Sequence, residues 1–131
     1  MIAIDSSALI AIFRLEPEAD RFLKTIVAAE GRVISALTVL ETSMVMSGGA
    51  RGDDVFTPLD EFLLEAGIRI LPFDGEQARI ARGAFLRFGK GRHRAGLNLG
   101  DCASYAAAKA NDAPLLYKGE DFAHTDLVAA A

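Results

Sequence analysis

Four acidic residues of this sequence lie beside or within apolar segments, where the role of an ordinary solvated surface charge does not explain them. Asp5 follows the apolar first four residues, and Asp121 follows a second apolar stretch near the carboxyl end of the chain. Glu41 lies within an apolar helical pattern, and Asp101 begins an alanine-rich segment. A carboxylate in apolar surroundings is unfavourable unless it is paired, hydrogen-bonded or bound to a metal. These four residues are therefore the first candidates for a functional site.

The chemistry that such a set favours is binding of a hard divalent cation. Carboxylate oxygens without histidine or thiolate partners suit Mg²⁺ or Mn²⁺, which prefer oxygen ligands and retain water. The single cysteine, Cys102, cannot form an internal disulfide or a zinc cage. A cation held by carboxylates can activate a water and neutralise charge on a phosphoryl group, so hydrolysis of a phosphate ester is the reaction class to consider.

Each acid also has a purely structural interpretation. Asp5 can cap the helix that follows it, and Asp101 is favourable near the positive end of a helix dipole. Glu41 can point outward from its helix, and Asp121 is an ordinary turn residue. The structural interpretation weakens when the four are taken together, because all of them would have to fall by chance at strand ends and adjoining helix starts.

The elements that would position these acids alternate along the chain. Short apolar strands are expected at 1–4, 32–35, 68–71 and 115–117, with helices between them. One helix is expected after Pro17 with an apolar stripe of Phe22, Leu23, Ile26 and Val27, and one at 36–46 with Leu37, Leu40, Met44 and Val45 on one side. Further helices are expected at 55–66, from Asp74 to about Gly89 with Ala78, Ala81, Phe85 and Phe88 spaced for packing, and from Asn98 or Gly100 onward.

This alternation predicts an α/β fold: a three-layer sandwich in which a short, mainly parallel sheet of four or five strands is flanked by helices. Ligands of such sheets bind outside the carboxyl ends of the strands. Asp5 follows the first strand, and Glu120 and Asp121 follow the fourth, so we expect the acids to meet at that edge.

Length and composition agree with one compact domain covering residues 1–131. The 131 residues are 51% hydrophobic and 24% charged, which excludes a disordered tail, a collagen-like fibre and a coiled coil. Without an apolar run long enough for a membrane helix, without a visible signal segment and with one cysteine, we expect a soluble protein of the cytoplasm.

Net charge is unevenly distributed. The chain carries −4 overall, yet its segment 79–94 holds six basic residues and no acidic one. The remainder has 8 basic against 18 acidic residues, a balance of −10. Lys90, Arg92 and Arg94 lie in a glycine-rich stretch that directly precedes the Asp101 helix, where they can hold a polyanion such as RNA. The alternative is a solvated helix face and loop.

The motifs around the acids resemble those of the PIN-domain ribonucleases, and within them the VapC-type toxins of bacterial type II toxin-antitoxin systems. The matching segments are Ile4-Asp5-Ser6-Ser7-Ala8-Leu9, Thr38-Val39-Leu40-Glu41, Leu97-Asn98-Leu99-Gly100-Asp101-Cys102, and Leu115 to Phe122 followed by Thr125-Asp126. They span essentially the whole chain, in order and spacing.

The resemblance implies a PIN-like fold and a toxic, metal-dependent endoribonuclease that hydrolyses RNA phosphodiester bonds. Asp5 and Asp101 would hold one or two Mg²⁺ ions, with Mn²⁺ as a substitute, while Glu41 and Asp121 would act through water. Ser7 would support the metal-binding acids without contacting the metal itself. Many relatives have an acid two positions before Asp121, where this chain has Gly119, so the fourth acid is either Asp121 or Glu120.

The resemblance further implies a cognate VapB-type antitoxin that inserts a segment into the active-site groove, and a homodimer. Two other functions stay open at this point. One is a PIN-fold RNA-binding module that has lost catalysis. The other is a phosphoacceptor receiver domain, for which Asp74 and Lys118 fit loosely but Glu41 and Asp101 have no role.

Overall fold

A four-stranded parallel sheet forms the middle layer of the protein. The computed structural model describes all residues, 1–131. The strands are β1 (Ile2–Ile4), β2 (Arg32–Ser35), β3 (Arg69–Leu71) and β4 (Leu115–Leu116). They pair in the order β3-β2-β1-β4, and every pairing is parallel, so all four carboxyl ends lie at one edge of the sheet. A bridge between Leu115 and Ala129 lays the carboxyl-terminal segment beside β4.

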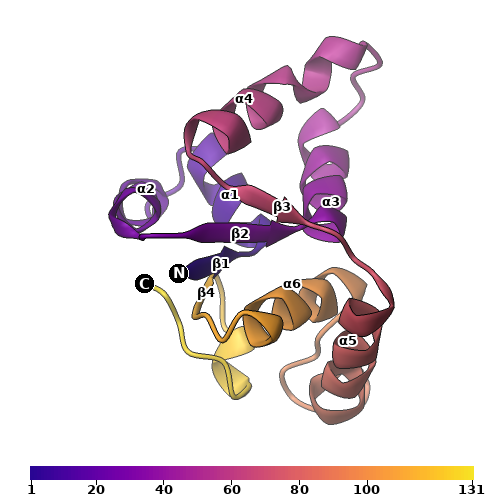
Figure 1. Cartoon of the computed structure of the whole chain (residues 1–131). Coiled ribbons are helices and arrows are strands. Elements are labelled where there is room, and N and C mark those ends of the chain that lie inside the picture. Colours follow the sequence, from indigo (N-terminus) through magenta and orange to yellow (C-terminus); the bar gives the residue numbers. More distant parts are fainter.

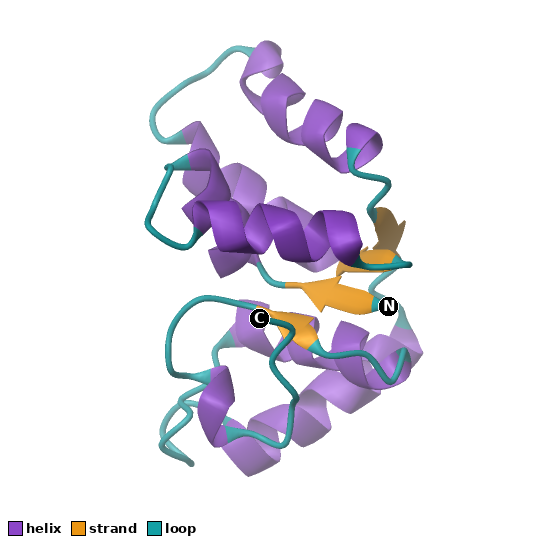
Figure 2. Cartoon of the chain, turned by 90° about the vertical axis from the view of Figure 1, so that its left-hand side faces the viewer, coloured by secondary structure: helices purple, strands orange, loops and turns teal.

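Helices cover both faces of the sheet, giving three layers (Figures 1 and 2). Above the sheet in Figure 1 lie α1 (Ser6–Phe13), α2 (Ala19–Ala28), α3 (Ala36–Ser47) and α4 (Thr57–Glu65), the last preceded by the 3₁₀ turn η1 (Asp53–Phe56). Below it lie α5 (Gly75–Phe88) and α6 (Leu99–Ala110), and a second 3₁₀ turn, η2 (Phe122–His124), follows β4. The three-layer α/β fold expected from the sequence is confirmed.

The alternation of side chains along the strands divides the interior into two cores. Ile2 and Ile4 of β1 pack with the helices above, whereas Ala3 between them packs with α5 and α6 below. Successive residues of a strand point to opposite faces, which is why one short strand serves both cores. The alanine-rich α6 buries its residues 102–108 and so approaches the sheet closely. This brings the start of α6 beside the strand ends.

Three details of the expected helices are wrong. In α2 only Phe22 and Ile26 of the expected stripe are buried, and Val27 is 75% exposed, because α2 packs mainly against α1 and buries one narrow side there. The single helix expected at 55–66 is instead η1 followed by α4, with Pro58 in the first turn of α4. In α5, Phe85 is 40% exposed rather than packed.

None of the helices combines the length and apolar character that a membrane crossing requires. The strand order also separates this fold from a receiver domain, whose doubly wound sheet has the order 2-1-3-4-5. That alternative is therefore wrong.

Candidate functional site

Asp5 is the buried centre of the site. It follows β1, caps α1, and only 2% of it is exposed. Its Oδ2 accepts hydrogen bonds from the Ser7 amide at 3.0 Å and from the Ser7 hydroxyl at 2.6 Å. Its Oδ1 accepts one from the Ser104 hydroxyl at 2.5 Å. The cap and the buried carboxylate are the same group, so the structural and functional interpretations of Asp5 are compatible.

Glu41 reaches the site from α3. Its Oε1 accepts a hydrogen bond from the Ser6 hydroxyl at 2.7 Å. On its other side it lies against the backbone of Gly100, where an added Cβ would stand only 2.0 Å from Oε2. Glu41 therefore points inward to the junction of α1 and α6, and a glycine at the start of α6 provides the space.

Asp101 lies in the first turn of α6 and forms a reciprocal cap with Asn98. The Asp101 amide donates to Asn98 Oδ1 at 2.9 Å, and Asp101 Oδ2 accepts from the Asn98 amide at 3.1 Å. Burial raises the pKa of the Asp101 carboxyl to about 6, against the lowering effect of the bond from Asn98. The charges of Asp5, Glu41 and Asp121 raise this pKa further.

The four predicted acids lie near enough to one another for the charges of Asp5, Glu41 and Asp121 all to act on Asp101. Asp121 stands exposed at the start of η2, close enough to act on Asp101, whereas Glu120 acts on the pKa of Tyr117 instead. Asp121 is thus the better placed of the two candidates for the fourth acid. No lysine or arginine forms an ion pair with any of the four. The cluster is therefore negative and uncompensated by the protein itself.

The donor set fits a hard cation bound partly through water. All donors are carboxylate oxygens, which is the preference of Mg²⁺ and Mn²⁺. No three histidine, cysteine or acidic side chains converge tightly enough to ligate a common ion directly. Asp5 and Glu41 already accept hydroxyl hydrogen bonds. A shell of one or two direct carboxylates completed by water is the arrangement that these residues favour, and it is usual for Mg²⁺.

Ser7 joins the site to the end of β4. Besides donating to Asp5, its hydroxyl accepts a hydrogen bond from the Lys118 amide at 3.0 Å. The Lys118 ammonium turns away from the cluster and pairs with Glu16 at 3.2 Å and Glu18 at 3.4 Å. Lys118 therefore fixes the segment before Asp121 without neutralising the acids.

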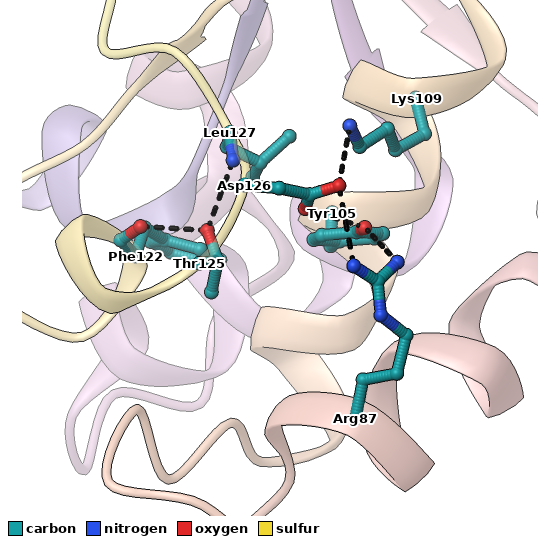
Figure 3. A network of polar contacts seen from close by, with 7 residues as sticks. All are labelled: Arg87, Tyr105, Lys109, Phe122, Thr125, Asp126 and Leu127. Atoms are coloured by element: carbon teal, nitrogen blue, oxygen red, sulfur yellow. Dashed lines mark hydrogen bonds and ion pairs between the residues drawn. The ribbon is translucent and has the colours of Figure 1, made fainter.

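A second polar network holds the segment after Asp121 (Figure 3). The Asp126 carboxylate accepts from the Tyr105 hydroxyl at 2.7 Å and pairs with Lys109 at 2.9 Å and with Arg87 at 3.6 Å. These partners lie on α5 and α6. Because Asp126 ties η2 and its flanks to those helices, the network sets the position of Asp121.

The predicted RNA-binding residues lie in an ordered loop between α5 and α6. Lys90, Arg92 and Arg94 are exposed, and none of them forms an ion pair. The Arg92 guanidinium stands 5.3 Å from the centre of the Phe85 ring. The His93 ring accepts a hydrogen bond from the Ala95 amide at 3.0 Å, so it shapes the loop. The three cations, which precede α6 in the chain, are therefore free to contact an anion.

Sequence reasoning missed four residues that touch the site: Ser6, Thr38, Ser104 and Gly100. Ser104 had a detectable signal, because a hydroxyl three residues after Asp101 shares its helix face amid alanines. Ser6 had none, since only the packing of α1 on α3 brings it to Glu41. Cys102 is buried, and burial raises the pKa of its thiol to about 11, which does not suit a nucleophile.

Known proteins match this sequence over nearly its whole length. The profile of the PIN domain matches residues 2–128. Ribonuclease VapC30 of Mycobacterium tuberculosis is 44% identical over 130 residues, which cover 99% of this chain and 98% of that protein. Ribonuclease VapC of Mycolicibacterium smegmatis is 44% identical over 128 residues, 98% of each.

Solved structures of similar shape include three that cover nearly the whole chain. VapC20 of Mycobacterium tuberculosis, described as a sarcin-ricin loop cleaving toxin, superposes with a TM-score of 0.76 at 14% identity, over 98% of this chain and 97% of that one. FitAcB from Neisseria gonorrhoeae gives 0.64 at 25% identity, over 98% and 96%. VapBC2 from Rickettsia felis, bound to a DNA fragment from their promoter, gives 0.74 at 16% identity, over 98% and 97%.

Proposed function

Because the chain belongs to the PIN-domain family as a VapC-type ribonuclease, we propose that it is a toxin that hydrolyses RNA phosphodiester bonds internally with the help of Mg²⁺, for which Mn²⁺ can substitute. The observation that carries the proposal is the uncompensated cluster around Asp5. A buried carboxylate beside three others is stable only when a cation or protons offset their charge. Burial is the main cause of the raised pKa of Asp101, and the charges of the other three acids raise this pKa further, in agreement with that need.

The four acids have different roles in this proposal. Asp5 and Asp101 contact the cation directly, since Asp5 is central and Asp101 is the acid on which the other three charges act. Glu41 and Asp121 act through water, and either can orient the attacking water. A divalent cation held there supplies a more acidic bound water and offsets charge on the phosphate. Ser7 holds Asp5 in its orientation through two hydrogen bonds.

RNA meets the protein at the basic loop. Lys90, Arg92 and Arg94 bind backbone phosphates, because exposed unpaired cations supply most of the affinity for a polyanion without selecting its sequence. Their support is the absence of ion-pair partners and their place immediately before α6, the helix that carries Asp101.

Two protein partners complete the proposal, which places the toxin in the cytoplasm. A VapB-type antitoxin neutralises it by placing a segment in the groove at the acids. A toxin-antitoxin complex from Klebsiella pneumoniae has the same fold and supports this partner. A second copy forms a homodimer on the exposed apolar face of α3, α5 and α6. That face holds a groove of about 990 Å³ lined by Leu86 and Leu99. A neighbouring groove of about 440 Å³ is lined by Glu41 as well as Met44 and Leu99, so it leads to the acids and suits the antitoxin segment.

A cleavage assay tests the function. The purified chain is incubated with structured RNA in Mg²⁺, in Mn²⁺ and in EDTA. Its molar mass in solution is measured separately and tests the proposed homodimer. We expect internal cleavage that EDTA abolishes and excess Mg²⁺ restores. Asp5→Asn and Asp101→Asn should each lower the rate at least about 100-fold with unchanged circular dichroism, because each removes a charged ligand.

Asp60→Asn is the control, because Asp60 is an exposed acid on α4 outside the cluster. Its rate should match that of the native chain. Undiminished cleavage in EDTA would contradict the metal, and full activity of both Asp5→Asn and Asp101→Asn would contradict the site. Native chain that binds RNA without cutting it under any metal would instead be the catalytically silent binding module.

A further inference from the structure

A chain of buried hydroxyl groups runs beneath the acidic cluster. The Ser104 hydroxyl lies 2.5 Å from Asp5 Oδ1 and 3.2 Å from the Thr38 hydroxyl. Ser104 is 1% exposed and Thr38 is not exposed at all, so water does not reach either group. Neither residue is one of the acids or lies next to one in the sequence.

The direction of the hydrogen bonds follows from counting protons. A serine hydroxyl has one proton to donate. An ionised carboxylate can only accept, so the proton of Ser104 points to Asp5 Oδ1. The contact between the two hydroxyls must then be donated by Thr38 and accepted by Ser104. The order of donation is Thr38 to Ser104 to Asp5.

This order joins the three elements that carry the inner acids. Thr38 lies on α3 three residues before Glu41, and Ser104 lies on α6 three residues after Asp101. Residues three apart share a helix face. Asp5 ends β1. Each hydroxyl therefore lies about one helical turn from an acid of the same helix. Both hydroxyls lie where α3 and α6 meet near the end of β1.

The same bonds determine which oxygen of Asp5 is available to a cation. Oδ2 accepts two hydrogen bonds, both from Ser7, whereas Oδ1 accepts only the one from Ser104. Each carboxylate oxygen has about two lone-pair sites. The free site is thus on Oδ1, and the bond from Ser104 fixes the direction in which it faces.

We propose that Ser104 and Thr38 are positioning residues for the cation site: their buried hydroxyl relay orients Asp5 Oδ1 and sets the spacing of the acids on α3 and α6. The inference rests on the proposed function, since it concerns the cation of that same site. Hydrogen bonds behind a metal ligand commonly change metal affinity about 10- to 100-fold.

Titration calorimetry of the native chain and its variants with Mn²⁺ and with Mg²⁺, without RNA, tests the relay. Ser104→Ala removes the donor to Asp5 and should raise the metal Kd about 10-fold or more. Thr38→Val keeps the shape but removes the hydroxyl, and should raise the Kd about 3- to 10-fold. Thr38→Ser retains the hydroxyl and should restore a Kd within about twofold of the native value.

The matched control is Thr42→Val. Thr42 is buried on α3 one turn beyond Thr38, and its hydroxyl donates only to the Thr38 carbonyl at 2.8 Å. It should cost stability to urea as Thr38→Val does, yet leave the metal Kd unchanged. A merely structural role for Thr38 would make these two variants alike in both measurements.

The outcomes separate the relay from the function. If the native chain binds metal and Thr38→Val binds it equally well, the relay is wrong while the metal-dependent function stands. This comparison decides the question even if Ser104→Ala does not fold. Weaker binding by Thr42→Val equal to that by Thr38→Val overturns the relay too. Native chain that binds neither ion overturns the metal-dependent function and the relay with it.

Discussion

At the scale of single residues, the site uses groups that also build the fold. Asp5 caps α1 and Asp101 takes part in the reciprocal cap of α6. A capping carboxylate is already oriented by backbone amides before any ligand arrives. The structural role therefore accounts for the position of these acids, while their burial and mutual repulsion account for their chemistry.

Gly100 gives the sharpest prediction at this scale. In Gly100→Ala the new Cβ would lie 2.0 Å from Glu41 Oε2 and 2.4 Å from Cδ, so the Glu41 side chain must move. Alanine is favoured over glycine inside a helix, so the fold should be retained. We expect RNA cleavage to fall about 10- to 100-fold, because small displacements of positioned groups have effects of that size. Initial rates at saturating Mg²⁺ measure it.

Gly75→Ala is the matched control, since Gly75 begins α5 and an added Cβ there would meet nothing within 4 Å. It should leave the rate unchanged. Equal rates for Gly100→Ala and the native chain would show that Glu41 can move without consequence.

At the scale of elements, α3 shows why the direction of a helix face is hard to predict. Its apolar residues Leu40, Met44 and Val45 face outward, while its threonines Thr38 and Thr42 are buried. An ordinary amphipathic helix buries its apolar side and exposes its polar one, whereas α3 packs only Val39 and Met46 of its apolar residues against the core. Thr38 belongs to the hydroxyl relay proposed above, Thr42 bonds only to the Thr38 carbonyl, and the exposed apolar row belongs to the face proposed for a second copy.

The Asp126 network predicts how pH affects the anchoring of η2. Burial by itself raises the pKa of the Asp126 carboxyl, but bonds from Lys109 and Tyr105 and the nearby positive charges outweigh it and lower the pKa below its usual value. A folded pKa below the unfolded one stabilises the fold above about pH 4, and this contribution is lost as pH falls through the folded value. Asp126→Asn should therefore lower the free energy of unfolding by about 1 kcal/mol at pH 7, and by progressively less as the pH falls below about 4.

Urea unfolding of the native chain and Asp126→Asn at pH 7, 5 and 3 measures this difference. Asp112→Asn is the control: Asp112 has a positive φ of 47°, which asparagine also adopts, and it forms no ion pair. A difference for Asp126→Asn that is as large at pH 3 as at pH 7 would contradict the electrostatic account.

At the scale of the whole molecule, acidic and basic side chains are separated into different regions. The net charge of −4 would by itself argue against RNA as a partner. The structure gathers uncompensated acids at the strand ends and leaves the basic loop before α6 unpaired. A polyanion can therefore be attracted to one part of an acidic protein.

The salt dependence of RNA binding tests this arrangement. Replacing Lys90, Arg92 and Arg94 by serine in the Asp101→Asn background should weaken RNA binding at low salt. It should also reduce the slope of log K against log salt by about 2, near 0.7 per lost phosphate contact. Replacing Arg14, Arg21 and Lys24 instead changes net charge equally and should leave the slope nearly unchanged. Equal slopes for the two triple variants would contradict a specific role for the loop.

The sequence alone determined the succession of strands and helices and the family, and it predicted the four acids, because apolar periodicity and short motifs are local properties of the chain. Strand and helix ends were correct to within a residue or two wherever a cap marked them, as at Asp74 and Asn98. Only the tertiary structure brings Asp121 near enough for its charge to act on Asp101, and places Ser6, Ser104 and Gly100 against the acids, with Thr38 bonded to Ser104. Those contacts join residues up to 99 positions apart, and no local pattern encodes which faces of α1, α3 and α6 meet at the end of β1.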